Sequence, residues 1–171
     1  PDTNESKMFI IDKFSGHAGG IASNGNDLWI SSGGSSSSNG KIYHFTVDMF
    51  TGESGSSVKY DGYFSVPVKG SVLYCDGDKL WVSEFYNNDK DSNKVNNEHH
   101  KGKNHAWSCG YNLPLGVDYS AKETKAPDVI LSIPDKVQGM SITADGEVIF
   151  STSYGRRNDS RIYVFEPYTE W

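Results

Sequence analysis

Residues 69–84 read KGSVLYCDGDKLWVSE, and this stretch decides the fold class. Strand-forming residues at 72–74 lead into turn residues at 76–79, and a second strand-forming run follows at 80–83. The Asp-Gly pair between the two runs supplies the positive φ that a tight hairpin turn requires. The stretch therefore predicts two antiparallel strands joined by a turn.

The same pattern occurs twice more, as HAGGIASNGNDLWISS at 17–32 and QGMSITADGEVIFSTS at 138–153. Each copy carries an aromatic residue four positions after its turn glycine. The glycines are Gly25, Gly77 and Gly146, and the aromatic residues are Trp29, Trp81 and Phe150. Aromatic residues at equivalent strand positions predict a packing layer between repeats, with a stacking platform for a carbohydrate as the alternative.

Two further strand-forming runs accompany each hairpin. A third strand follows it, at 41–45, 106–111 and 161–165, and an outer strand precedes it, at 8–11, 63–66 and 129–133. Four antiparallel strands per repeat is the plan of a propeller blade. We therefore predict an all-β chain of about three four-stranded blades, half of a six-bladed ring. The predicted segment spans 1–171, with blade-like units at about 7–48, 60–113 and 128–167 and a polar insertion at about 86–105.

Charge and hydropathy exclude several classes of partner. The formal net charge is −6, the pI is about 5.3, and the basic residues are scattered, so we expect neither nucleic acid nor an anionic membrane surface to bind. No apolar run reaches the roughly 20 residues that span a bilayer. The glycosylation acceptor pattern at Asn4 and Asn158 favours an extracellular or secreted protein.

The segments HAGGIA, LWISS, KLWVSEF and VQGMSITADGEVIFSTSYGR together resemble six-bladed propellers. The broad group is that of strictosidine synthase, the gluconolactonases and the paraoxonases. The resemblance implies ligand binding at the central channel, often with a bound calcium ion and with hydrolysis of a lactone or ester. In those families, inward-facing Glu, Asn and Asp hold the metal, whereas the corresponding strands here carry His17, Lys69 and Gln138.

Polar residues at equivalent positions of the three repeats are the candidate binding residues. His17, Lys69 and Gln138 begin the three inner strands, and Glu84 ends a second strand on the same face. Convergent polar groups in a concave site are typical of ligand binding, and solvated channel residues are the alternative. We predict a site for a small molecule or carbohydrate, formed by His17, Lys69, Glu84, Gln138 and Arg156.

Catalytic and metal-binding motifs are weak by comparison. The chain has no GxSxG, HExxH, P-loop or dinucleotide fingerprint, so no catalytic residue is predicted. In the polar insertion, Glu98–His100 and His105 do not form a ligand set, because adjacent histidines in a strand point to opposite sides. Residues 89–93 lack the glycine and the terminal glutamate of an EF-hand loop. We predict no metal ligands. A bound calcium ion is an alternative that the resemblance to the propeller group implies.

The leading functional hypothesis is a ligand-binding or recognition propeller. The alternatives are a metal-assisted lactone or ester hydrolase and a structural propeller that serves protein contacts. Cys75 and Cys109 fall on strands separated by a third strand, which is too far for a disulfide, so both are predicted to be free thiols.

Three blades do not close a ring. The strand at 8–11 is predicted to be the outer strand of a blade that is missing, and the last blade, ending at 161–165, lacks its own outer strand. Exposed sheet edges and apolar blade faces favour association. We therefore predict that further blades come from another chain or from a second copy.

Overall fold

The predicted hairpins form a series of antiparallel sheets. The computed structural model describes residues 6–14, 16–33, 39–87 and 104–170, and within these ranges it contains no α-helix, so the predicted all-β class is confirmed. The first sheet has the order β2-β3-β4-β6, with β2 Ala18–Asn24, β3 Asp27–Ser32, β4 Gly40–Thr46 and β6 Gly62–Val66. Within the described part of the chain, no helix is long and apolar enough to cross a membrane.

The second and third sheets follow in sequence order. The second consists of β7 Val72–Cys75, β8 Lys79–Ser83, β9 Ala106–Asn112 and β10 Val129–Ile133. The third consists of β11 Val137–Ile142, β12 Val148–Thr152 and β13 Arg161–Phe165. The outer strand that precedes a hairpin in sequence belongs to the preceding sheet, because β6 pairs with β4 and β10 pairs with β9.

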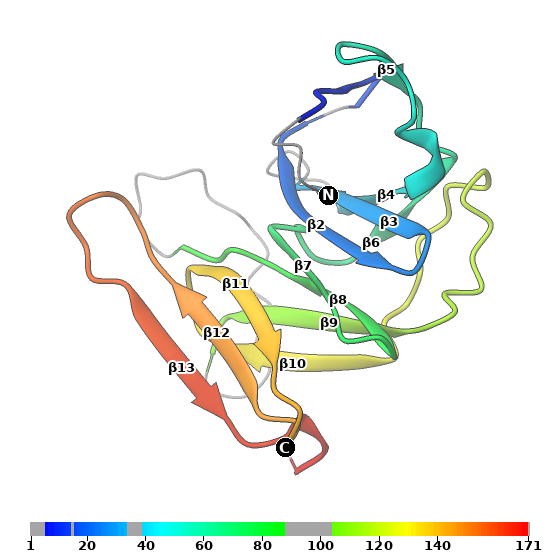
Figure 1. Cartoon of the computed structure of the whole chain (residues 1–171). Helices are drawn as coiled ribbons and strands as arrows, with labels where there is room; N and C mark the ends of the chain where they lie inside the picture. The colour runs from blue at the N-terminus through cyan, green and yellow to red at the C-terminus, as the bar shows by residue number, and fades with distance from the viewer. Residues whose placement is uncertain (1–5, 15, 34–38, 88–103, 171) are drawn as a thin grey trace.

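The second sheet lies between the other two, and the first strands of all three sheets come together (Figure 1). Strand β7 contacts both β2 and β11, whereas the outer strands belong to separate sheets. The described strands form three main sheets side by side and one two-stranded sheet, and they form no closed ring. The described part of the chain also contains two short 3-10 helices, η1 Val47–Met49 and η2 Tyr168–Glu170.

The three turn glycines have the positive φ angles that the sequence predicts. Gly25, Gly77 and Gly146 all have positive φ, at 60°, 98° and 88°. Backbone in this region is strained for residues that carry a Cβ, which explains why glycine occupies the turn in every repeat.

The predicted packing of aromatic residues between sheets is confirmed, but Phe150 faces the preceding sheet, whereas Trp29 and Trp81 face the following one. Trp29 packs between the first and second sheets, and Trp81 packs between the second and third. Phe150 points back toward the second sheet and shares the cluster of Trp81. All three side chains are at most 2% exposed, so none offers a face for stacking a sugar.

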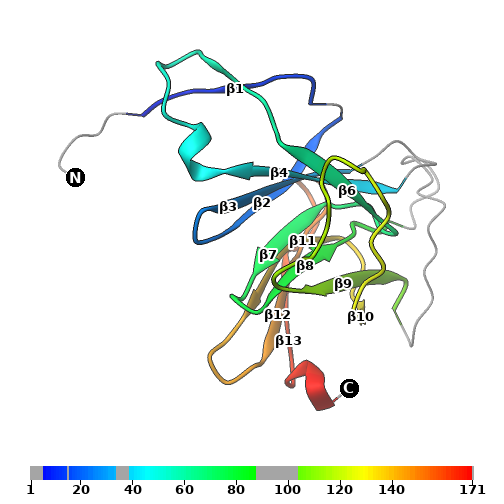
Figure 2. The ribbon, with the colours of Figure 1, turned by 90° about the vertical axis from the view of Figure 1, so that its right-hand side faces the viewer.

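The N-terminal strand does not take the predicted position. Residues 8–11 were expected to form the outer strand of a missing blade, and this prediction is wrong. Strand β1, Ile10–Ile11, instead pairs in parallel with β5, Ser57–Val58, and lies over the first sheet (Figure 2). The reason is apolar burial, because Phe9, Ile11 and Phe14 cover the outer face of this sheet, with the Phe14 ring 4.7 Å from that of Tyr43.

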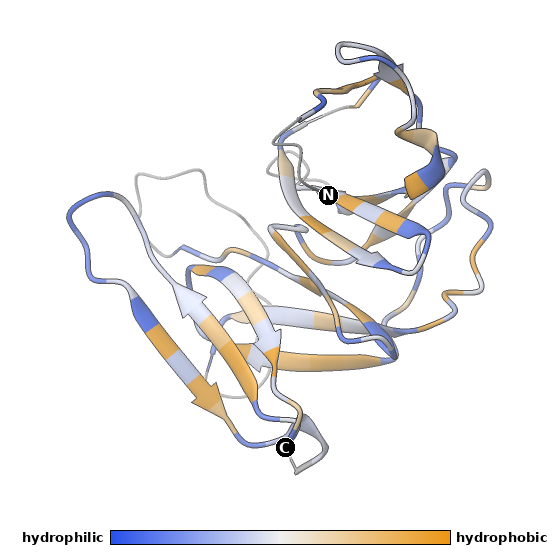
Figure 3. Ribbon diagram, in the orientation of Figure 1, coloured by the Kyte–Doolittle hydropathy of each residue, from blue (hydrophilic) through white to orange (hydrophobic). Residues whose placement is uncertain are grey.

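The outer face of the third sheet, at the other end of the series, is open. Ile162 and Val164 on β13 are 67% and 57% exposed, and β12 places Ile149 opposite Val164 on the same face. We call Ile149, Ile162 and Val164 the open face. Hydrophobic segments are visible along β12 and β13 (Figure 3). No described strand pairs with the free edge of β13.

Both cysteines are free thiols, as predicted, and β8 lies between their strands. Cys109 is fully buried, and this burial raises the pKa of its thiol to about 12. Burial also raises the pKa of Cys75, to a smaller extent. Neither cysteine is therefore in the environment of an activated thiolate.

Adjacent sheets approach most closely at two glycines of β2. A Cβ on Gly19 would overlap the carbonyl oxygen of Gly70, and a Cβ on Gly20 would overlap the backbone nitrogen of Leu73. Backbone atoms cannot move aside as a flexible side chain can. Glycine at these positions therefore allows β2 and β7 to lie side by side.

We predict that Gly20→Ala lowers the free energy of unfolding by about 1–3 kcal/mol, because the added methyl group pushes β2 away from β7. Gly33→Ala is the matched control, since a Cβ there would meet nothing closer than the Gly70 oxygen at 3.9 Å. Urea denaturation measures both variants. Equal stability of the two variants would contradict the close approach.

Candidate functional site

Three of the predicted binding residues lie around one cavity. His17 precedes β2, Lys69 precedes β7, and Gln138 is the second residue of β11, so the contact between inner strands brings the three together. They line a cavity of about 280 Å³, which we call the inner-strand cavity. The other described residues that line it are Gly19, Gly33, Gly70, Ser71 and Phe85.

Lys69 is the most unusual residue of this cavity. It is only 9% exposed, yet its side chain makes no hydrogen bond or ion pair with any described residue. Burial lowers the pKa of its ammonium, and the charge of Glu84 opposes that effect. The structure thus places a largely buried lysine residue at the wall of a cavity.

Glu84 lies behind the cavity wall and is absent from the lining. It follows β8 and is completely buried. Its backbone N–H donates to the Trp107 carbonyl oxygen at 3.0 Å, and its Oε1 accepts the Trp107 N–H at 2.8 Å. The second bond holds the carboxylate beside the Trp107 backbone, and the carboxylate acts on Lys69 through its charge.

The other lining residues supply neutral polar groups and one ring. Gln138 donates from Nε2 to the Ser153 carbonyl oxygen at 3.4 Å. The Ser71 hydroxyl oxygen accepts the Phe85 N–H at 3.2 Å, which leaves the hydroxyl hydrogen able to donate. Arg156, the fifth predicted residue, is exposed in the link between β12 and β13 and is not part of this cavity.

A larger and more polar cavity, of about 530 Å³, lies between the second and third sheets. His105 and Asp135 line it, with Nδ1 3.2 Å from Oδ2, and the imidazole stacks on Tyr86. The other residues of the weak metal hypothesis, 89–93 and 98–100, lie outside the described residues. In the described ranges, no three His, Cys, Asp or Glu side chains gather as metal ligands.

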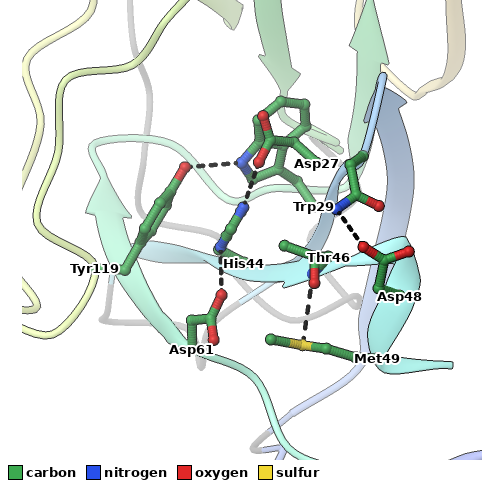
Figure 4. A network of polar contacts seen from close by, with 9 residues as sticks. Asp27, Trp29, His44, Thr46, Asp48, Met49, Asp61 and Tyr119 are labelled. Atoms are coloured by element: carbon green, nitrogen blue, oxygen red, sulfur yellow. Dashed lines mark hydrogen bonds and ion pairs between the residues drawn. The ribbon is translucent and has the colours of Figure 1, made fainter.

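A polar network that the sequence analysis missed lies at the opposite end of the first sheet (Figure 4). His44 on β4 is enclosed by two carboxylates, with Nε2 2.8 Å from Asp27 and Nδ1 3.0 Å from Asp61. Its ring stacks on Tyr119 with centroids 4.1 Å apart, and the Tyr119 hydroxyl accepts the Trp29 Nε1–H at 3.2 Å. Each ring nitrogen of His44 thus faces a carboxylate oxygen within hydrogen-bond distance.

This network joins segments that are far apart in the chain. Asp27 begins β3, Asp61 precedes β6, and Tyr119 belongs to the segment between β9 and β10. Its only signal in the sequence is a histidine inside the apolar strand IYHF. That pattern predicts burial of His44 but does not identify its partners. We assign the network a structural role, because it holds the loops at this end of the sheet in place.

The comparisons with known proteins identify no relative. No protein family matches the chain, and neither curated proteins nor solved structures give a significant match. Membership of the six-bladed propeller group is therefore not shown. What stands is an all-β chain of several antiparallel sheets, with a cavity where their inner strands begin.

His44→Phe tests the structural role of the polar network. The phenyl ring keeps the stacking on Tyr119 and loses both contacts with carboxylates. Because Asp27 and Asp61 are about half exposed, we expect the free energy of unfolding to fall by about 1–2 kcal/mol. The control is Asp48→Asn, an exposed partner of Asn26, with a change within about 0.5 kcal/mol. Unchanged stability of the His44 variant in urea denaturation would show that the network contributes nothing.

Proposed function

We propose that the chain is a ligand-binding segment of a β-propeller, with its ligand site at the inner-strand cavity. Consecutive antiparallel sheets whose first strands lie together, and whose outer strands belong to separate sheets, fit the plan of propeller blades. The ring proposed here has six blades, of which this chain supplies about three.

One observation carries the binding proposal. Residues at equivalent positions of three repeats, His17, Lys69 and Gln138, reach the same cavity from three different sheets. Ligand sites combine a concave surface with a few converging polar groups, and this cavity adds the ring of Phe85. Its volume suits a small molecule.

The open face supports a second part of the proposal, concerning partners. An exposed apolar face beside an unpaired strand edge favours association with another sheet. We propose that the remaining blades, from another chain or a second copy, pack on Ile149, Ile162 and Val164. We also propose an extracellular or secreted location, supported by the exposed acceptor asparagine Asn158.

Blocking the cavity tests the proposed site. Gly33→Phe adds a ring where a Cβ has free space, so it fills the cavity without disturbing β2 or β7. We expect a compound selected by NMR screening to shift the amide signals of Gly70, Ser71 and Gln138, and to lose at least about tenfold in affinity in this variant.

The control is Thr51→Phe, which adds the same ring at an exposed position away from the cavity lining. It should bind like the unmodified protein. Compounds that shift only signals elsewhere, or that bind Gly33→Phe with unchanged affinity, would rule out this cavity as the ligand site.

A further inference from the structure

Lys69 allows the chemistry of the ligand to be specified, and this step rests on the proposed function. An ammonium group has three N–H donors and is strongly hydrated in water. Here the lysine residue as a whole is only 9% exposed, and no described residue accepts a hydrogen bond from its ammonium. A buried cation without a direct partner is costly, and an anion bound beside it removes that cost.

We propose that the inner-strand cavity binds a small monocarboxylate, whose carboxylate group pairs with the ammonium of Lys69. The neighbouring groups suit this ligand. The Ser71 hydroxyl and the Gln138 amide are additional donors for carboxylate oxygens, and the Phe85 ring offers an apolar wall for the body of the molecule.

The charges around the cavity favour one negative charge over two. Among the described residues of the lining, Lys69 is the one lysine or arginine, and the charge of the buried Glu84 carboxylate acts on it. His17, which is exposed, is the other titratable side chain among the described lining residues. A doubly charged phosphate would bring a second negative charge toward Glu84, and the described lining offers no second lysine or arginine to balance it.

Benzoate is a suitable probe, with benzamide as its uncharged isostere and phenyl phosphate as the doubly charged comparison. Isothermal titration calorimetry at constant ionic strength should show benzoate binding most tightly. Lys69→Met keeps the length of the side chain and removes the charge, so benzoate affinity should fall at least about tenfold. Lys59→Met, at an exposed lysine outside the lining, should stay within about twofold.

Lys69→Arg retains the charge and should restore much of the benzoate binding. If Lys69→Met fails to fold, the NMR shift of the Lys69 side chain on titrating the unmodified protein with benzoate replaces it as the measurement. The proposal is overturned if benzamide or phenyl phosphate binds as tightly as benzoate, if benzoate does not bind, or if it leaves the Lys69 signal unmoved.

The same experiment separates this proposal from the function on which it rests. Suppose that a neutral compound shifts the Ser71 and Gln138 signals and that Gly33→Phe blocks its binding. This result would support the cavity as the ligand site and would contradict the proposal that its ligand is a carboxylate. Binding that is confined to other parts of the surface would overturn both.

Discussion

The close approach of two backbones, β2 and β7, is the constraint on which the rest of this structure depends. Gly19 and Gly20 leave no room for a side chain between the strands, so the inner edges of the first two sheets come together. Strand β11 joins them on the other side of β7. Because each inner strand follows a short connection, the residues before or at its start meet as well. The cavity with His17, Lys69 and Gln138 is a direct consequence of this packing.

The outer faces of the first and third sheets differ in how far they are covered by other residues. At the first sheet, β1, β5 and the rings of Phe9 and Phe14 cover the outer face. At the third sheet, the open face exposes aliphatic side chains beside a free strand edge. Repeat proteins require covered terminal units, and a face without a cover favours packing against another repeat. This asymmetry supports the proposal that further sheets pack on the third sheet.

Much of the fold could be predicted from sequence because it is encoded locally. The Asn-Gly and Asp-Gly turns, the alternation of strand residues and the aromatic four positions after each glycine depend only on neighbours within a hairpin. The pairing of Ile10 with Ser57 could not be predicted in this way, since it depends on which apolar surface the first sheet leaves uncovered. The network of His44 likewise requires carboxylates brought in by separate loops.

The candidate site, too, could be predicted from the sequence only where it depends on the repeat. The repeat predicts that His17, Lys69 and Gln138 share one end of the inner strands, because equivalent positions in a repeat occupy equivalent places. It does not predict that Glu84 is buried behind the wall or that Arg156 is outside the lining, since both depend on the course of the connections after β8 and β12. The desolvation of Lys69 also depends on how tightly the inner strands pack.

Sedimentation equilibrium of the purified chain over a wide concentration range tests the central claim, that these sheets are part of a larger ring, most directly. The account predicts a mass above the 18.9 kDa of one chain, rising with concentration. It also predicts a shift toward monomer when Ile162 and Val164 are both replaced by glutamate, because the charges oppose burial of the open face. A constant mass of 18.9 kDa, together with cooperative unfolding and no effect of the double replacement, would contradict the account.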